Sequence, residues 1–374
     1  MGVSLRNKRW FRMLAHVCRI VFACTFILSG FVKAVDPWGT ALNITNYLTI
    51  YGFDALKPFV MVFSIWLCGA ELMMGCMMLF KVRVRLISIF AVLSMVFFTT
   101  LTFLSATWIP VEDCGCFGEF VKLTPWQTFA KNLVLLPMAV CVWWRYRPDR
   151  VFSFSKLELA LTILFCSASM GLGIYSYYHL PPFDFLPYKV GVNIAEAMEQ
   201  VRNEQAEADV VLVYRNRRTG KLKEFSLDDK AWHNDKKWEW VDTRVSEEDG
   251  NKVEPMILEF YISDEQGHDV TDSLLLVKGK LYMLCVSRLN GIGASCEQHL
   301  HSAVERAEQE RAAIVCLTPE SLQERKWQSF NGSAPVRCYN IDAKTMKTML
   351  RANVGLVELT DGTITAKYNC RDIR

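Results

Sequence analysis

Long apolar stretches fill the first half of the chain, whereas short strand-like and mixed helical patterns fill the second. Five stretches are apolar over roughly the 20 residues that a helix needs to cross a bilayer: residues 14–32, 59–80, 86–111, 125–144 and 159–180. The stretch 125–144 is the least apolar, because Lys131 and Pro137 interrupt it. The pattern predicts five membrane helices, the last of which ends at Pro181-Pro182.

The first stretch has an alternative interpretation as a signal peptide that is cleaved off. No A-x-A cleavage site follows it, and Lys33-Ala34-Val35-Asp36 instead indicates the exit of a helix. Arg19 interrupts the stretch near enough to a helix end for its side chain to reach water by snorkelling. We therefore expect this stretch to remain as the first membrane helix.

Lysine and arginine alternate between the loops in a way that predicts orientation. The N-terminus, the turn near residue 83 and the turn near residue 150 are rich in cations, whereas the loops 36–57 and 112–122 are poor in them. Because cytoplasmic loops carry the excess of Lys and Arg, the N-terminus is predicted to be cytoplasmic. Five crossings of an inner membrane then place the residues after 180 in the periplasm. Disulfides are permitted there, and seven cysteines would face that side.

Charge divides the chain at the same point. Residues 1–180 contain 16 Lys and Arg against 8 Asp and Glu, and residues 181–374 contain 26 against 31. No basic patch interleaved with aromatic residues occurs in the acidic half. Nucleic acid is therefore not an expected partner, whereas membrane lipid is.

The third loop contains Cys114-Gly115-Cys116-Phe117-Gly118. Two thiols separated by one glycine can close only a small, strained disulfide ring, which is easily reduced and suits exchange. Two other interpretations remain open, a plain turn with free thiols and half of a metal site. A metal site would need two further ligands, and no other His or Cys lies nearby in sequence.

One carboxylate and one cation stand out inside the apolar stretches. Glu71 lies in the middle of the second one, where a charge costs about 2.5–3.5 kcal/mol on insertion scales unless it is protonated or paired. Lys33 ends the first one, and sequential helices are usually neighbours. We expect a Lys33–Glu71 pair inside the bundle, with either a structural or a functional role.

Together these motifs resemble a known family. About residues 10–147 are similar to the MauE family of DoxX-like membrane proteins. Four motifs carry the similarity: the string from Ser29 to Pro37, the string Glu71-Leu72-Met73-Met74-Gly75, the Cys-Gly-Cys-Phe-Gly loop and Trp126…Lys131-Asn132. The resemblance implies a four-helix bundle, an association with methylamine utilisation and help in the maturation of a disulfide-rich dehydrogenase subunit. It also implies that Cys114 and Cys116 are the thiol pair, and Lys33 and Glu71 the intramembrane polar pair. The chain adds a fifth helix and a large external domain.

The second half begins with residues 183–252, which contain a β-hairpin at 210–225 and three tryptophans, Trp232, Trp238 and Trp240, expected in a small packed cap. Residues 253–374 follow a β-α-β-α-β-β order that resembles a thioredoxin-like domain of the TlpA and peroxiredoxin type. The expected elements are strands at 256–262, 281–286 and 313–317, helices at 295–311, 319–330 and 343–351, and a final hairpin at 356–368 with Asp361-Gly362 at its turn.

The expected Cys-x-x-Cys of a catalytic thioredoxin domain is missing. Only Cys296 lies near the start of the helix that follows the first core strand, and Val354 stands where the family has its cis-proline. Three interpretations stay open: a one-thiol site at Cys296, a non-catalytic fold used for docking, and a structural disulfide.

The sequence thus predicts an α-helical membrane bundle (1–150), a fifth helix with a linker (151–182), a hairpin-containing cap (183–252) and an α/β thioredoxin-like domain (253–374). The leading functional hypothesis is extracytoplasmic thiol–disulfide exchange or maturation of partner proteins, with a periplasmic redox or client protein as partner. The alternative is a non-enzymatic scaffold, so enzymatic activity stays open. The sequence identifies no metal or cofactor, and a quinone or other electron acceptor stays unknown.

Overall fold

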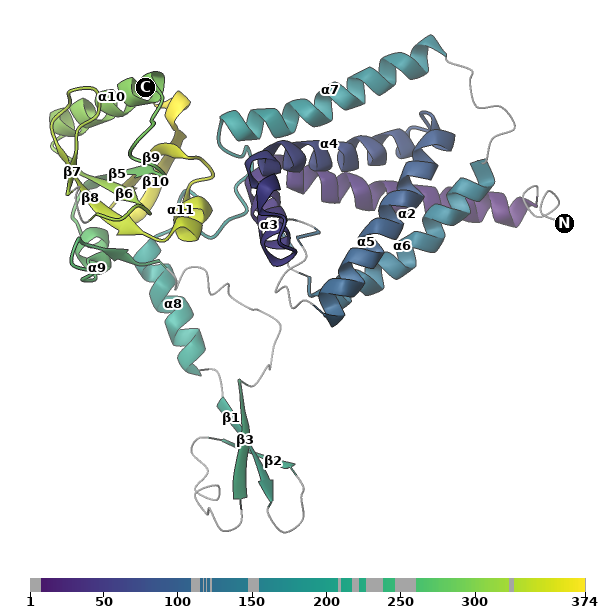
Figure 1. The fold of residues 1–374 in the computed structure, drawn as a ribbon, viewed down its shortest axis with the longest axis horizontal. Helices are drawn as coiled ribbons and strands as arrows, with labels where there is room; N and C mark the ends of the chain where they lie inside the picture. The colour runs from purple at the N-terminus through teal and green to yellow at the C-terminus, as the bar shows by residue number, and fades with distance from the viewer. Residues whose placement is uncertain are drawn as a thin grey trace. The chain divides into compact units, whose positions relative to one another are not determined.

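The computed structural model describes residues 8–108, 115–116, 118, 120–121, 123–146, 155–207, 210–216, 222–226, 238–245, 260–322 and 326–373 (Figure 1). The chain forms two compact units. The first consists of Met1–Leu186, Leu350–Gly355 and Tyr368–Arg374, and the second of Pro187–Met349 and Leu356–Lys367. Each unit is described by itself below.

The first unit is built mainly from long helices: α2 (Arg9–Val35), α3 (Pro37–Ile50), α4 (Val60–Leu79), α5 (Val84–Thr107), α6 (Pro125–Tyr146) and α7 (Lys156–Tyr178). A 3-10 turn, η1 (Asp54–Phe59), leads into α4. Within the described part of the chain, four helices are long and apolar enough to cross a membrane: α2, η1 with α4, α5 and α7. The chain is therefore a multi-pass membrane protein. The predicted stretch at 125–144 forms helix α6, whose passage through the membrane stays a prediction.

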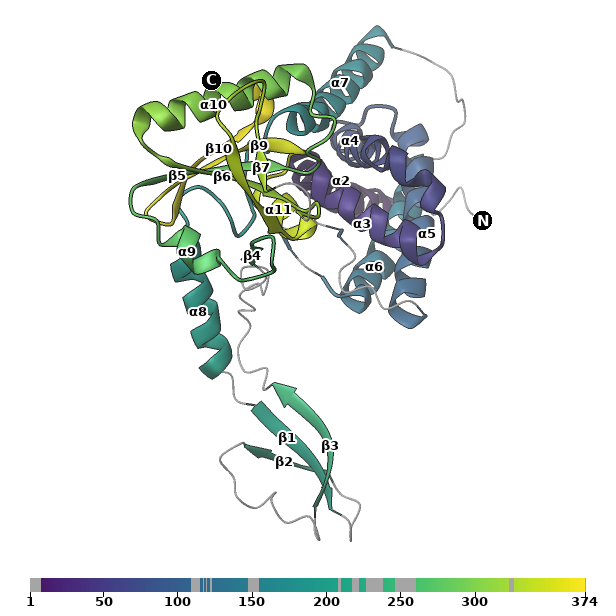
Figure 2. The ribbon, with the colours of Figure 1, turned by 60° about the vertical axis from the view of Figure 1, so that its left-hand side comes forward.

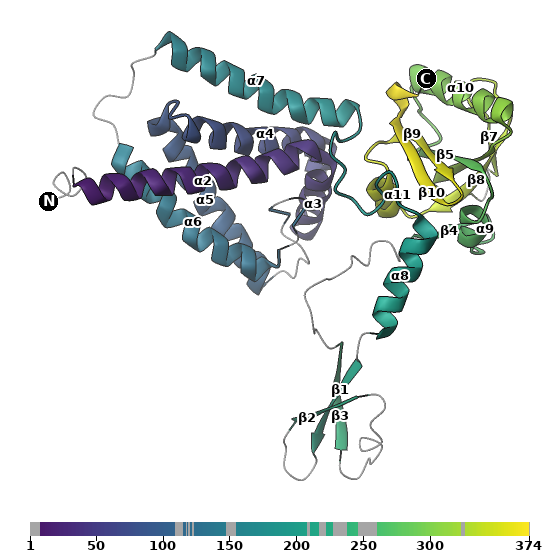
Figure 3. The same ribbon diagram turned by 180° about the vertical axis from the view of Figure 1, so that it is seen from behind.

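Helices α2 and α4 run side by side because small residues let their backbones approach closely (Figures 1 and 3). A Cβ added at Gly30 of α2 would lie 2.7 Å from the Cα of Leu72, and one added at Gly75 of α4 would lie 2.7 Å from the backbone nitrogen of Ile27. Close approach at small residues is a common means of helix association in membranes. The contacts fix the register of the two helices.

Arg19 does not snorkel to water as expected. Its side chain is buried, and its Nη1 donates hydrogen bonds of 2.6 Å to the carbonyl oxygens of Met78 and Leu79. The last carbonyls of a helix have no partner within the helix, so a cation there satisfies them and favours the negative end of the helix dipole. The nearby end of α4 therefore provides a better partner for Arg19 than water at the membrane surface.

The first loop contains a helix, α3, that the apolar pattern did not predict. Asp36 caps it by accepting a hydrogen bond of 3.1 Å from the backbone nitrogen of Gly39, and Pro37 occupies the first helical position. Asp at the N-cap followed by Pro is a recognised start signal for a helix. The signal was present in the sequence, but α3 is only 14 residues long and lies below the length of a membrane crossing.

The second unit begins with α8 (Ile194–Glu207) and a three-stranded sheet. Its order is β2-β1-β3, from β1 (Val210–Asn216), β2 (Leu222–Ser226) and β3 (Trp238–Val245), and both pairings are antiparallel. The predicted hairpin at 210–225 is confirmed. Trp238 and Trp240 lie in β3, where Trp238 is buried, while Trp232 lies outside the described residues.

A seven-stranded mixed sheet forms the α/β part, and Figure 2 shows it with α10 along one face. Six of its strands follow the order β10-β9-β5-β6-β8-β4, and β7 pairs with β8. The strands are β4 (Ile262–Ser263), β5 (Lys280–Val286), β6 (Ala313–Thr318), β7 (Trp327–Gln328), β8 (Val336–Ile341), β9 (Val354–Thr360) and β10 (Thr363–Asn369). The helices are α9 (Thr271–Leu275), α10 (Ala294–Glu310) and α11 (Ala343–Met349), and η4 (Cys370–Asp372) follows β10.

This order confirms the thioredoxin-like prediction with one correction. The strands and helices expected at 281–286, 295–311, 313–317 and 343–351 are present, and Asp361 and Gly362 make the final turn with positive φ. The helix expected at 319–330 is wrong. That segment contains the short strand β7, and a turn with positive φ at Asn331 and Gly332 then leads into β8, parallel to β6. Of the strand expected at 256–262, residues 256–259 lie outside the described part.

Replacing Gly30 by alanine should weaken the contact between α2 and α4, because a Cβ there would overlap the backbone of Leu72. Overpacking typically costs about 1–3 kcal/mol. Gly171→Ala on α7 is the matched control, since a Cβ at that position meets nothing within 4 Å. Thermal unfolding of the purified chain in detergent should give a lower midpoint for Gly30→Ala than for Gly171→Ala. Equal midpoints would contradict the close packing.

Candidate functional site

A buried polar cluster joins α2 to α4 inside the membrane bundle. Lys33 Nζ lies 2.8 Å from Oε2 and 3.0 Å from Oε1 of Glu71. Lys33 and Glu71 are only 6% and 5% exposed. The structure thus brings together the two charged residues singled out in the sequence. Each charge neutralises the other where neither has water to solvate it.

Ser29 connects this ion pair to the loop that contains Cys116. Its Oγ lies 3.0 Å from Oε2 of Glu71 and 2.6 Å from the backbone carbonyl oxygen of Cys116. Ser29 precedes Lys33 by four residues on the same helix, so both side chains point from one face of α2 toward Glu71. A hydroxyl has one hydrogen, so Ser29 can donate to only one of these two acceptors at a time. The carboxylate and the cysteine loop therefore share a single donor.

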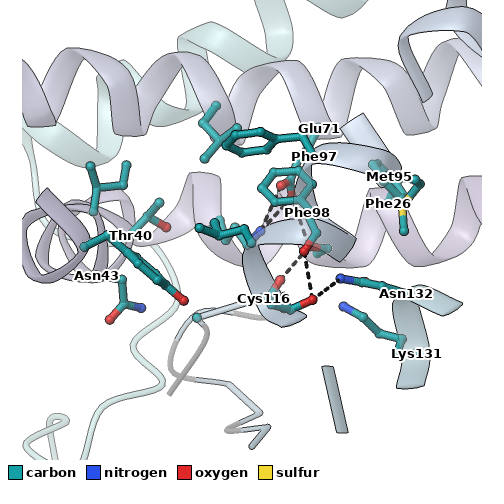
Figure 4. A pocket seen from close by; sticks show the side chains of 18 of the residues that line it. Phe26, Thr40, Asn43, Glu71, Met95, Phe97, Phe98, Cys116, Lys131 and Asn132 are labelled. Carbon is teal, nitrogen blue, oxygen red and sulfur yellow. Dashed lines mark hydrogen bonds and ion pairs between the residues drawn. The ribbon is translucent and has the colours of Figure 1, made fainter. Parts of the chain in front are cut away.

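A pocket of about 290 Å³ adjoins the polar cluster (Figure 4). Its lining is mainly apolar and comes from α2, α3, α4, α5 and α6 together with residues 115 and 116. In Figure 4, Cys116 lies between Asn43 on one side and Asn132 on the other, with Phe98 close by. Asn132 is buried and its Nδ2 lies 3.4 Å from Oγ1 of Thr102. The pocket therefore combines an apolar wall with hydrogen-bond donors and a thiol.

A described thiol lies near this polar cluster. The thiol of Cys116 is half-buried and lies within electrostatic range of the Lys33 ammonium. Cys114 lies outside the described residues. Within the part of the chain that the structure describes, no three His, Cys, Asp or Glu side chains gather in a way that could hold a metal ion.

The comparisons with known proteins bear on this bundle. Residues 11–145 match the model of the family described as methylamine utilisation protein MauE. This segment is a MauE domain. It begins two residues into α2 and ends near the last residue of α6. The MauE domain therefore contains Lys33, Glu71, Ser29 and the loop with both cysteines, so all the residues of the polar cluster come from one family segment.

The chain is also similar to the curated Protein TlpB of Flavobacterium psychrophilum. The two are 30% identical over 132 residues, which are 34% of this chain and 35% of the relative. The chain thus spans about a third of that relative's length. No solved structure matches the chain.

In the thioredoxin-like part, the described cysteines are not disposed for exchange. Cys296 lies at the third position of α10 and is disulfide-bonded, as is Cys370, so neither offers a free thiol in this structure. Gly293 stands three positions before Cys296, where a thioredoxin pair would have its other thiol. Cys285 and Cys316 are fully buried in neighbouring strands of the sheet. Burial raises the pKa of the Cys285 thiol from 9.0 to about 12.

Sequence reasoning missed Ser29, Thr102 and Asn132 as members of the site. A signal existed for Ser29, because its spacing from Lys33 places both on one helix face. Asn132 was named only as part of the family string, beside Lys131. Thr102 had no signal, because a threonine in an apolar helix usually donates to the carbonyl four residues before it, as Thr102 also does to Phe98 at 2.8 Å.

Lys33→Met should destabilise the bundle by about 3–5 kcal/mol, because it leaves the carboxylate of Glu71 buried without a counter-ion. The double variant Lys33→Met/Glu71→Leu should recover most of that loss. Lys57→Met is the control, since Lys57 pairs with Asp54 at 2.7 Å but both are exposed, and such pairs contribute about 0–1 kcal/mol. Thermal unfolding in detergent measures all three variants. A double variant less stable than Lys33→Met would contradict the buried pairing.

Cys285 should make the stability of the second unit fall at alkaline pH. Its thiol ionises near pH 9.0 when unfolded but only near 12 when folded, so its contribution is complete below pH 9.0 and is lost as pH rises toward 12. The slope is at most about 1.4 kcal/mol per pH unit. Urea unfolding followed by tryptophan fluorescence should show a shallower alkaline loss for Cys285→Val than for the unchanged chain. Parallel pH profiles would show that Cys285 does not contribute.

Proposed function

We propose that this chain is a membrane component of extracytoplasmic thiol–disulfide exchange, with Cys114 and Cys116 as the exchanging pair. One observation carries the proposal: Cys116 lies at the buried Lys33–Glu71–Ser29 cluster, with its carbonyl oxygen 2.6 Å from Ser29 Oγ. The contact from Ser29 holds the backbone of the reactive residue. The spacing of the two cysteines supplies a second thiol at once.

The exchange itself needs no metal. When the pair is a disulfide, a client thiolate attacks one of its sulfurs, the Cys114–Cys116 bond breaks and a mixed disulfide forms. The second client thiolate then attacks the client sulfur of that mixed disulfide, which leaves the client oxidised and the Cys114–Cys116 pair as two thiols. Two electrons and two protons thus pass from the client to the pair.

The proposed orientation places this chemistry on the oxidising side. The cation-rich turns would be cytoplasmic, and the cysteine loop and the second unit would be periplasmic, at the inner membrane. This arrangement requires α6 to cross the membrane together with the four helices of sufficient hydropathy. The family's description links the MauE domain to methylamine utilisation. We propose that the partner is a protein with paired cysteines, and we do not propose methylamine as a substrate.

A second function, a non-enzymatic scaffold, has a specific observation in its favour. Cys296 is disulfide-bonded and Gly293 stands in place of a second thiol, so the thioredoxin-like part has no dithiol at α10 in this structure. In this case the second unit would bind a client and the membrane bundle would anchor it. The two functions differ in whether the thiol of Cys116 changes its redox state.

Differential alkylation of Cys116 in intact cells tests the proposal. Cycling thiols should be found partly oxidised, and the double variant Cys114→Ser/Cys116→Ser should leave thiols of exported clients reduced. The matched control is Cys24→Ser/Cys166→Ser, which removes two exposed thiols of α2 and α7 that lie outside the cluster. Clients that stay oxidised in the first double variant, or Cys116 found wholly in one state, would favour the scaffold instead.

A further inference from the structure

The pocket in the MauE domain reaches from the surface of the bundle to the cysteine loop. Phe97 lines it and is 62% exposed, on a helix long and apolar enough to cross a membrane. The inner wall includes Phe26 and Met95, which are 5% and 2% exposed, while Cys116 and Lys33 line the polar end. A ligand could therefore enter from lipid at Phe97 and meet the thiol without passing through water.

The polar end of the pocket contains two buried hydrogen-bond donors beside the Glu71 carboxylate, which is paired with Lys33. The ammonium of Lys33 and the amide of Asn132 both line it and both are buried. Asn132 carries two amide hydrogens, and its one described side-chain contact, to Thr102, is long at 3.4 Å. A ligand that fits here should be apolar over most of its surface and carry oxygen acceptors at one end. The volume of about 290 Å³ is near the lower limit of ligand pockets, about 300–1,000 Å³, and suits a single substituted ring.

We infer that this pocket binds the ring of a lipid-soluble quinone. The inference rests on the proposed function, because the dithiol returns to its disulfide only by passing its two electrons to an acceptor, which is thereby reduced. A quinone satisfies each requirement: its carbonyl oxygens accept from Lys33 and Asn132, its ring packs against Phe98 and Met95, and its apolar tail leaves past Phe97. Cys116 lines the same pocket, so the electron donor and the acceptor are neighbours.

The redox step balances without any further reactant. The two thiols of Cys114 and Cys116 lose their hydrogens and form one S–S bond, which releases two electrons and two protons. The quinone takes up both electrons and both protons, so its two carbonyl oxygens become the hydroxyls of a hydroquinone. The hydroquinone leaves into the lipid and the disulfide is ready for the next client.

A lipid acyl chain is the competing occupant, because it would satisfy the apolar wall equally well. Its hydrocarbon part has no oxygen to accept hydrogen bonds from Lys33 and Asn132. The two occupants therefore differ in whether binding depends on the carbonyl groups, and this difference decides the experiment.

Equilibrium binding of decylubiquinone to the full chain in detergent tests the inference. The Cys114→Ser/Cys116→Ser variant is used, so that binding is measured without thiol chemistry. Binding should be saturable and tighter than that of decylbenzene, which has the same tail and no carbonyl.

Asn132→Leu should weaken quinone binding about tenfold, the effect of losing one hydrogen bond, and leave decylbenzene binding unaffected. Leu101→Trp, which fills the pocket, should abolish it, whereas Leu93→Trp, exposed elsewhere on α5, should not.

Several results overturn the inference: no saturable binding, equal binding of decylbenzene, or unchanged quinone binding in both Asn132→Leu and Leu101→Trp. Circular dichroism of each variant tests its fold, and Asn132→Leu decides the question if Leu101→Trp does not fold.

Failure of the proposed function can be distinguished from failure of the pocket inference. If the Ser variant binds quinone but Cys116 of the unchanged chain never cycles in cells, the exchange function is wrong and the binding site stands. If Cys116 cycles but no quinone binds, only the pocket inference is wrong.

Discussion

The interaction on which this site depends is the burial of one ion pair between two apolar helices. Lys33 and Glu71 are each expensive to place inside a membrane, and together they are tolerable only at hydrogen-bond distance. That distance requires α2 and α4 to approach closely, which Gly30 and Gly75 permit. Ser29 then extends the polar cluster to the backbone of Cys116. Glycine packing, charge pairing and the position of the cysteine loop are thus parts of one arrangement.

Thiol chemistry is unevenly distributed over the described cysteines. Cys285 and Cys316 are buried in the sheet. Burial raises the pKa of the Cys285 thiol, and a hydrogen bond with Cys338 together with burial raises the pKa of the Cys316 thiol, so neither is available as a nucleophile. Cys296 and Cys370 are disulfide-bonded. Cys116, half-buried and near a cation, is different from all of these. The thioredoxin-like part therefore has the fold but no Cys-x-x-Cys dithiol at α10. We propose that the exchange takes place at the membrane bundle instead.

Much of this architecture could be predicted because its signals are local and strong. The apolar runs and the Asp361-Gly362 hairpin follow directly from periodicity and turn chemistry. The helix expected at 319–330 was wrong, because this segment contains the short strand β7, and the Asn331-Gly332 turn leads into β8, which pairs in parallel with β6. The pocket could not be predicted. Its lining comes from five helices, α2 to α6, and only their packing brings Asn132 and Thr102 together.

Arg19 has a consequence for how the bundle can move. It donates hydrogen bonds to the carbonyl oxygens of Met78 and Leu79 at the end of α4. Lys33, about 20 Å further along α2, forms an ion pair with Glu71. These two polar contacts oppose sliding of α2 along α4. A shift by one helical turn, about 5.4 Å, would break the contacts of both Arg19 and Lys33 at once.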